Sequence, residues 1–229
     1  MRATSFLLLV GCAACSSTPY EITLPSADEA IPEILRGMPV YRTRFVAHGS
    51  AVPLGGSLLA SASHVVPYDP IPQESSGAAL QVEVVARGEG MPEAQEDWVV
   101  LRSPGLDIDP PYRVDFGHPV EEGDRVWLIG FPEASKLPED SPPEIVPATV
   151  ARFPPRSESH PREIPLFLPE RARYKGASGG AVVALEDGKP VLIGIFQGHR
   201  ELLDSENRRI GRLYIAVRLP RIRVSDSGH

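Results

Sequence analysis

Cysteine is almost absent from this chain of 229 residues. The two cysteines, Cys12 and Cys15, both lie near the N-terminus, so no disulfide can form in the rest of the chain. Packing alone must therefore hold the body of the protein together. Long helices are also nearly excluded, because 25 prolines are scattered along the sequence and proline interrupts helices and central strands alike.

A positively charged stripe is missing as well. No block of lysine or arginine is longer than two residues, and the formal net charge is −7. Because a nucleic-acid surface needs such a stripe to neutralise phosphates, we do not expect nucleic acid as a partner. The six histidines are dispersed, none has a second His or Cys at metal-ligand spacing, and no cofactor motif is visible. We therefore expect neither a metal site nor a cofactor.

The first residues resemble the signal peptide of a bacterial lipoprotein. Arg2 provides a positive start, and the apolar run over residues 6–10 is too short to span a membrane, which needs about 20 residues. The tetrapeptide Leu9-Val10-Gly11-Cys12 resembles the lipobox, in which the cysteine is acylated and the chain is cut before it. The resemblance implies a signal peptide over residues 1–11 and a lipid anchor at Cys12. An ordinary cleaved signal peptide with a coincidental cysteine is the alternative.

A lipid anchor would place the protein on the extracytoplasmic side of a bacterial cell envelope, in the periplasm or at the outer membrane. Several acyl chains hold a protein stably on a membrane, whereas one chain binds only marginally. The polar, proline-containing segment that follows predicts a lipidated tether over residues 12–40, with one possible helical turn between Asp28 and Arg36. The membrane is therefore an expected partner through this anchor.

From Tyr41 onward, short apolar or alternating runs are bounded by Gly, Pro and Asp, a pattern typical of an all-β sandwich or barrel. The pairs Gly55-Gly56 and Asp187-Gly188 predict hairpin turns. We expect strands over residues 41–47, 50–54, 57–61, 80–86, 98–102, 125–129, 145–152, 180–185, 191–196 and 212–218.

The segment Gly176-Ala177-Ser178-Gly179-Gly180 has the composition expected around an activated serine. A serine hydroxyl is a weak nucleophile that needs a base and backbone N–H groups aimed at the developing oxyanion. Glycine permits the sharp turn, and we expect the amides of Gly176 and Ser178 to form the oxyanion hole. A plain glycine turn before a strand is one alternative. The nucleophile elbow of α/β-hydrolases is another, but only 51 residues with little helical pattern follow Ser178.

The base and the acid must then precede the serine. His64 follows an apolar run and three small residues, and an imidazole can take and return a proton in a reaction at neutral pH, although a buried structural histidine would fit the same pattern. Asp97 leads directly into a fully apolar run, as expected of a carboxylate at the mouth of a strand. Glu96, Asp107 and Asp109 are the rival acids.

Together these segments resemble the trypsin-like (chymotrypsin-fold) serine peptidases, in particular the disulfide-free bacterial branch that includes the HtrA-type proteases. Ser61-Ala62-Ser63-His64 stands where those enzymes carry Thr-Ala-Ala-His, and residues 97–101 stand where they carry Asp-Ile-Ala-Leu-Leu. Residues 176–180 match the nucleophile loop, and residues 120–132, 187–195 and 214–217 resemble connecting segments. The likeness covers about residues 43–222.

The resemblance implies an all-β fold of two antiparallel barrels, the first over about residues 41–115 and the second over about 122–222, followed by a tail at 223–229. His64, Asp97 and Ser178 would form a catalytic triad in the cleft between them and hydrolyse a polypeptide substrate through an acyl-enzyme. The sequence lacks the Ile-Val-Gly-Gly start of zymogen-activated relatives. A catalytically degenerate binding module is the main alternative, and an esterase is a lesser one.

In such enzymes the P1 pocket is walled by the segments that correspond to residues 171–175 and 195–200 of this chain. Candidate substrate contacts are therefore Ala172, Arg173, Gln197 and His199. Several cationic groups near these positions suggest a preference for an acidic P1 side chain; alternatively, they are solvated rim residues. The natural substrate and the oligomeric state are not predicted.

Overall fold

The computed structural model describes residues 6–7, 21–22, 25–26, 29–44, 48–66, 82–88, 97–133, 138, 141–152, 161–169, 174–203, 206 and 208–221. Within this part of the chain the structure is nearly all β, apart from one helical turn, α1 (Glu33–Arg36), and one 3-10 turn, η1 (Ser63–Val65). Two short strands, β1 (Phe6–Leu7) and β2 (Glu21–Ile22), pair with each other. No described helix has the length and apolar character required to cross a membrane. The all-β prediction is confirmed.

The C-terminal half forms a closed barrel of six antiparallel strands. The strand order is β12-β9-β10-β11-β14-β13, and β13 pairs with β12 to close the barrel, while β8 (Arg113–Val114) joins β13 in parallel. Apolar side chains such as Leu128, Ile193 and Phe196 fill its interior. The barrel strands are β9 (Arg125–Gly130), β10 (Glu144–Val150), β11 (Glu163–Phe167), β12 (Ala181–Glu186), β13 (Lys189–Leu203) and β14 (Arg209–Val217).

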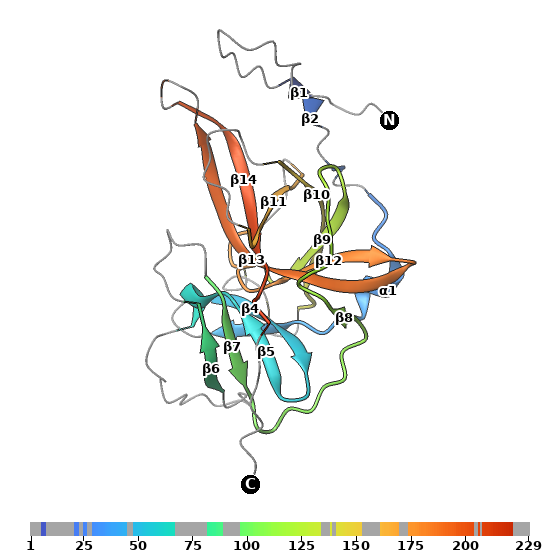
Figure 1. Cartoon of the computed structure of the whole chain (residues 1–229), viewed down its shortest axis with the longest axis vertical. Coiled ribbons are helices and arrows are strands. Elements are labelled where there is room, and N and C mark those ends of the chain that lie inside the picture. The colour runs from blue at the N-terminus through green and yellow to red at the C-terminus, as the bar shows by residue number, and fades with distance from the viewer. Residues whose placement is uncertain are drawn as a thin grey trace.

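The N-terminal half forms an antiparallel sheet with the order β3-β4-β5-β7-β6, which lies beside the barrel (Figure 1). Among the described residues β3 and β6 do not pair, so the sheet is open. The sequence analysis predicted that this half would also close into a barrel. Val84 on β6 is 47% exposed, as expected of a strand at a free edge. The two-barrel prediction is thus correct for the second half and wrong for the first. The strands are β3 (Tyr41–Arg44), β4 (His48–Gly55), β5 (Leu58–Ser61), β6 (Glu83–Arg87) and β7 (Val99–Arg102).

One hydrophobic cluster runs across both halves. It joins Val52 and Trp98 of the N-terminal half to Trp127 and Val183 of the barrel. Tyr112 belongs to the same cluster, and its hydroxyl donates a hydrogen bond to the Pro53 carbonyl at 2.8 Å. Burial raises the pKa of Tyr112, so the phenol keeps its proton and remains a donor. The shared core fixes the sheet and the barrel relative to each other.

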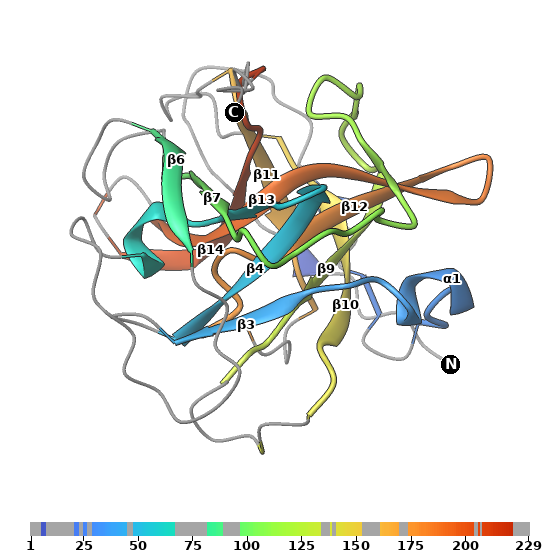
Figure 2. The ribbon, with the colours of Figure 1, turned by 90° about the horizontal axis from the view of Figure 1, so that it is seen from below.

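The packed part of the chain begins before the expected boundary at Tyr41. Leu35 and Met38 are buried in the shared core, at 1% and 3% exposure, and α1 lies beside the barrel in Figure 2. Two apolar side chains of the segment predicted as a tether are thus removed from water against the core. The single helical turn is confirmed.

The structure contains all ten expected strands within the described residues, with shifted ends. The hairpin turns are also present: Gly55 and Gly56 have φ values of 116° and 54°, and Asp187 and Gly188 have 50° and 74°. The sequence analysis missed β1, β2, β8 and β11. In β11 a proline obscured the strand pattern: Pro165 has no N–H to donate, but its carbonyl accepts a hydrogen bond from the Ala151 amide at 2.8 Å.

Candidate functional site

Neighbouring strands bring His64 and Asp97 together. β5 pairs with β7, with Ser61 opposite Val99, so the residues just beyond these strand ends are close in space. The Asp97 carboxylate accepts two hydrogen bonds: Oδ2 lies 2.6 Å from His64 Nδ1, and Oδ1 lies 2.8 Å from the His64 backbone nitrogen. Because an ionised carboxylate only accepts, Nδ1 must carry a proton in this contact, and in the neutral form of the imidazole Nε2 then has a lone pair.

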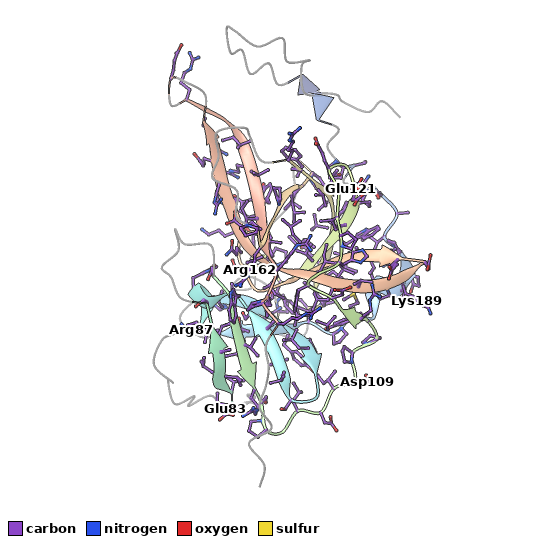
Figure 3. The ribbon with its side chains drawn as sticks, in the orientation of Figure 1. Glu83, Arg87, Asp109, Glu121, Arg162 and Lys189 are labelled. Carbon is purple, nitrogen blue, oxygen red and sulfur yellow. The ribbon has the colours of Figure 1, made fainter. Side chains whose placement is uncertain are left out.

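This pair has the burial that a base and its orienting acid require. The Asp97 side chain is 10% exposed, whereas the His64 side chain is 37% exposed. The carboxylate is thus fixed within the protein while the imidazole keeps an open side. Of the rival acids, Glu96 lies outside the described residues, and Asp107 and Asp109 are exposed; Figure 3 shows Asp109 on the connection between β7 and β8.

Ser178 lies in the loop that leads into β12. Its hydroxyl donates a hydrogen bond to the Gln197 carbonyl at 3.0 Å, and no hydrogen bond joins it to His64. Its own carbonyl accepts from the Ser50 amide of β4 at 2.7 Å. The serine loop is therefore anchored to both halves of the protein, while the Ser178 hydroxyl is turned toward β13.

The turn that carries His64 and the loop that carries Ser178 meet at Gly49. A Cβ atom added to Gly49 would lie 2.6 Å from Cγ1 of Val65, the neighbour of His64, and 2.9 Å from the Ser178 carbonyl oxygen. Such distances leave no room for any side chain at this position. A rotation of the Ser178 side chain about χ1 is the local motion that would direct its hydroxyl away from Gln197.

The backbone of the serine loop presents two amides without acceptors. The Lys175 carbonyl accepts a hydrogen bond from the Glu133 amide at 2.5 Å, and the Ala177 amide donates to the Tyr174 carbonyl at 2.9 Å. The amides of Gly176 and Ser178 have no acceptor among the described residues. Gly176 has a φ of 91°, which favours glycine, so the sequence supplies the residue that this turn needs.

Gly179 allows the serine loop to approach the N-terminal sheet. Its φ is 84°, and an added Cβ would lie 2.0 Å from the Ser50 carbonyl oxygen and 2.4 Å from Ser61 Oγ. Gly180 is equally confined, because a Cβ there would lie 2.6 Å from the Ile129 carbonyl oxygen. The glycine pair after Ser178 is thus required by backbone contacts with both halves.

Beyond the serine, β13 and β14 carry an aromatic and cationic cluster. The His199 and Tyr214 rings have centroids 6.2 Å apart, and the Tyr174 ring lies edge-on to both, at 5.1 Å from His199 and 4.8 Å from Tyr214. Cζ of Arg212 lies 5.6 Å from the centroid of the Tyr174 ring. Burial, and then the charge of Arg212, lower the pKa of His199, which favours a neutral imidazole at neutral pH.

The expected substrate contacts are thus only partly visible. Gln197 accepts the Ser178 hydrogen bond and His199 belongs to the cluster, whereas Ala172 and Arg173 lie outside the described residues, as does Cys12. The sequence analysis missed Arg212 and Tyr214. The alternation of a strand could have identified them, because residues two apart share a face and His199 pairs directly with Tyr214.

Comparison with solved structures identifies similar folds at low sequence identity. The Rv3671c protease of M. tuberculosis H37Rv, in an inactive form, superposes with a TM-score of 0.57 at 18% identity, over 86% of this chain and 93% of that chain. An inactive mutant of the murine norovirus NS6 protease gives a TM-score of 0.51 at 14% identity, over 79% of this chain and 94% of that chain. No protein-family model matches the sequence, and no curated protein matches it either. The likeness establishes the fold.

Proposed function

We propose that this chain, which has the fold of chymotrypsin-like proteases, is a serine endopeptidase that uses Ser178, His64 and Asp97. The observation that carries the proposal is the contact between His64 and Asp97, in which both carboxylate oxygens hold the histidine. A glycine-bounded serine supports it, beside the amides of Gly176 and Ser178, which have no acceptor in the described part of the chain. These groups are suited to acyl transfer from a peptide bond to the Ser178 hydroxyl.

In the proposed reaction the Ser178 hydroxyl attacks the carbonyl carbon of the scissile bond while His64 Nε2 takes its proton. Asp97 holds the imidazole and stabilises its protonated form. The oxyanion accepts hydrogen bonds from the amides of Gly176 and Ser178, and one such donor typically contributes about 10²–10³ in rate. His64 then protonates the leaving amine, the C–N bond breaks, and an acyl-enzyme remains. Water, deprotonated by His64, releases the acid and restores Ser178.

The alternative function is peptide binding without turnover. It is favoured by one observation, the hydrogen bond from the Ser178 hydroxyl to the Gln197 carbonyl at 3.0 Å, which holds the nucleophile away from its base. Catalysis requires this bond to be exchanged for one to His64. The proposal therefore includes a side-chain rotation of Ser178 when substrate binds.

A fluorophosphonate probe tests whether Ser178 is activated. Because such probes react with serines that a base activates beside an oxyanion hole, we expect the wild-type protein to be phosphonylated at Ser178. Mass spectrometry of the digested protein locates the adduct. The Ser178→Ala variant should remain unlabelled. A folded wild type that refuses the probe would support the binding module.

We further propose that the substrate carries an acidic side chain at P1. Arg212 supports this preference, because its Nε is buried without a hydrogen-bond partner and no carboxylate lies within ion-pair distance of its guanidinium among the described residues. Arg200 and Arg209 are already engaged, by Glu163 and Glu201 respectively. Glu201 lies opposite Arg212 in the strand register but is paired with Arg209. Among the arginines of β13 and β14, Arg212 is thus the one without a carboxylate partner in the described part of the chain, and it is the cation that we propose for a substrate carboxylate.

Replacing Arg212 with methionine should therefore lower kcat/KM for substrates with Glu at P1 by about 10- to 100-fold, the value of a hydrogen-bonded charge pair. Substrates with Leu at P1 should be affected less than threefold. Peptides that differ only at P1 provide the measurement, and Arg209→Met is the matched control, since Arg209 is paired with Glu201. A wild-type preference for Arg or Lys at P1 would contradict the proposed acidic specificity.

Tethering to the envelope through Cys12 stays a prediction from the sequence. It would hold the protease domain at an extracytoplasmic membrane surface, where polypeptides of the periplasm or outer membrane are its available substrates. Peptide-bond hydrolysis itself does not require the anchor.

A further inference from the structure

Ser50 connects the N-terminal sheet to the serine loop through three hydrogen bonds. It lies on β4 and is completely buried. Its amide donates to the Ser178 carbonyl at 2.7 Å, its carbonyl accepts from Ser61 Oγ at 2.7 Å, and its hydroxyl oxygen accepts from the Phe131 amide at 3.0 Å. Ser50 is thus in contact with the nucleophile's own backbone and with the end of β9.

The bond to Phe131 leads to the oxyanion hole. Phe131 begins the turn after β9, and two residues later the Glu133 amide donates to the Lys175 carbonyl at 2.5 Å. Glu133 has a φ of 52°, a conformation that is uncommon for a residue with a side chain. Because the Lys175–Gly176 peptide is trans, its N–H points opposite to its carbonyl. The turn at 131–133 therefore sets the direction of the Gly176 amide.

We propose that Ser50 is a positioning residue that, from the other half of the protein, aligns the Gly176 donor of the oxyanion hole and anchors the backbone of Ser178. Its amide holds the carbonyl of Ser178, and its hydroxyl holds the turn that orients the Gly176 amide. This role rests on the proposed function, since it concerns the same reaction. Ser50 itself touches neither the substrate nor the reacting atoms.

The positioning role can be tested by removing the Ser50 hydroxyl alone. Substitution by alanine keeps the amide and carbonyl bonds of Ser50 but leaves the Phe131 amide buried without an acceptor, a state that folded proteins avoid. The turn would then move to find another partner, and the Lys175 carbonyl would move with it. The space around Ser50 is tight, because a Cβ on Gly130 would lie 3.1 Å from Ser50 Oγ.

Steady-state kinetics of Ser50→Ala test the proposal. We expect kcat to fall about 10- to 100-fold, less than the loss of an oxyanion donor outright, with KM changed less than twofold. The inhibition constant of a peptidyl trifluoromethyl ketone, whose oxygen becomes an oxyanion on attack by Ser178, should rise by the same factor as kcat falls. Ser103→Ala is the matched control, because Ser103 is buried in the same half and its hydroxyl has no partner.

The possible results distinguish the positioning role of Ser50 from the proposed peptidase function. The positioning role would be overturned if Ser50→Ala had the kcat of the wild type, or if Ser50→Ala and Ser103→Ala lost equal factors in kcat. Either result would leave the proposed function intact. A wild type without hydrolysis or phosphonylation would overturn the proposed function instead. In that case crystals of Ser50→Ala still test the positioning role, and an unchanged Lys175–Gly176 peptide would contradict it. If Ser50→Ala does not fold, Ser50→Cys provides the test. Because a thiol is a weak hydrogen-bond acceptor, this variant should show a smaller decrease in kcat.

Discussion

Replacing Ser178 with alanine should lower kcat for peptide hydrolysis by about 10⁶, and replacing His64 with alanine should cost about the same. The two losses are similar because the hydroxyl is a poor nucleophile until the imidazole takes its proton, so either substitution disables the same step. Both variants should bind peptide with nearly wild-type affinity. Hydrolysis of a fluorogenic peptide, together with its dissociation constant, provides the measurement.

The double variant is the control for this prediction. If Ser178 and His64 act as a unit, removing both should cost little more than removing either one. A residual rate from the oxyanion amides, about 10³–10⁴ above the uncatalysed reaction, should remain in all three variants. Losses that multiply would show that the two residues act independently and would contradict the proposed mechanism.

Replacing Asp97 with asparagine should lower kcat by about 10⁴. Both carboxylate oxygens are in use, one facing His64 Nδ1 and the other the His64 backbone N–H. An amide has only one oxygen, so its NH₂ group must face one of these nitrogens. If it faces Nδ1, the imidazole takes the tautomer in which Nε2 carries the proton and cannot act as a base. KM should change little, because the Asp97 side chain is 10% exposed and acts through His64.

Asp109→Asn is the matched control for this substitution. It makes the same change from carboxylate to amide at an exposed position on the connection between β7 and β8 (Figure 3). Its kcat should equal that of the wild type. Comparable losses in both variants would show that net charge matters and that orientation of His64 does not.

Much of the fold could be predicted from local sequence signals. Glycine and proline mark where strands end, and Asp187-Gly188 supplies the positive φ values of a tight hairpin. β11 was missed because Pro165 looks like an interruption, although a carbonyl can still accept in the sheet. Leu35 and Met38 were assigned to a tether because a short polar segment does not reveal the core against which two of its side chains pack. Closure of a barrel likewise depends on pairing between distant strand edges.

The candidate site likewise combines features that the sequence predicted with features that it did not. His64, Asp97 and Ser178 were predicted from their local surroundings, and the structure brings the His64 and Asp97 side chains into contact. The sequence did not indicate that the Ser178 hydroxyl bonds to the Gln197 carbonyl, because a rotamer depends on what surrounds it. Nor did it identify Ser50, because its partners Phe131 and Ser178 are distant in the chain and no local motif distinguishes a buried serine of this kind. Arg212 was missed although strand alternation places it on the same face as Tyr214.

The central claim is that Ser178 is the nucleophile that receives the acyl group from a peptide or ester substrate. Rapid acid quenching of the wild-type protein during turnover of a peptide ester, followed by mass spectrometry of its digest, tests this claim most directly. The account predicts a transient acyl adduct on Ser178 that forms and decays at rates compatible with turnover. Substrate turnover without acylation of Ser178, and at an undiminished rate in Ser178→Ala, would contradict it.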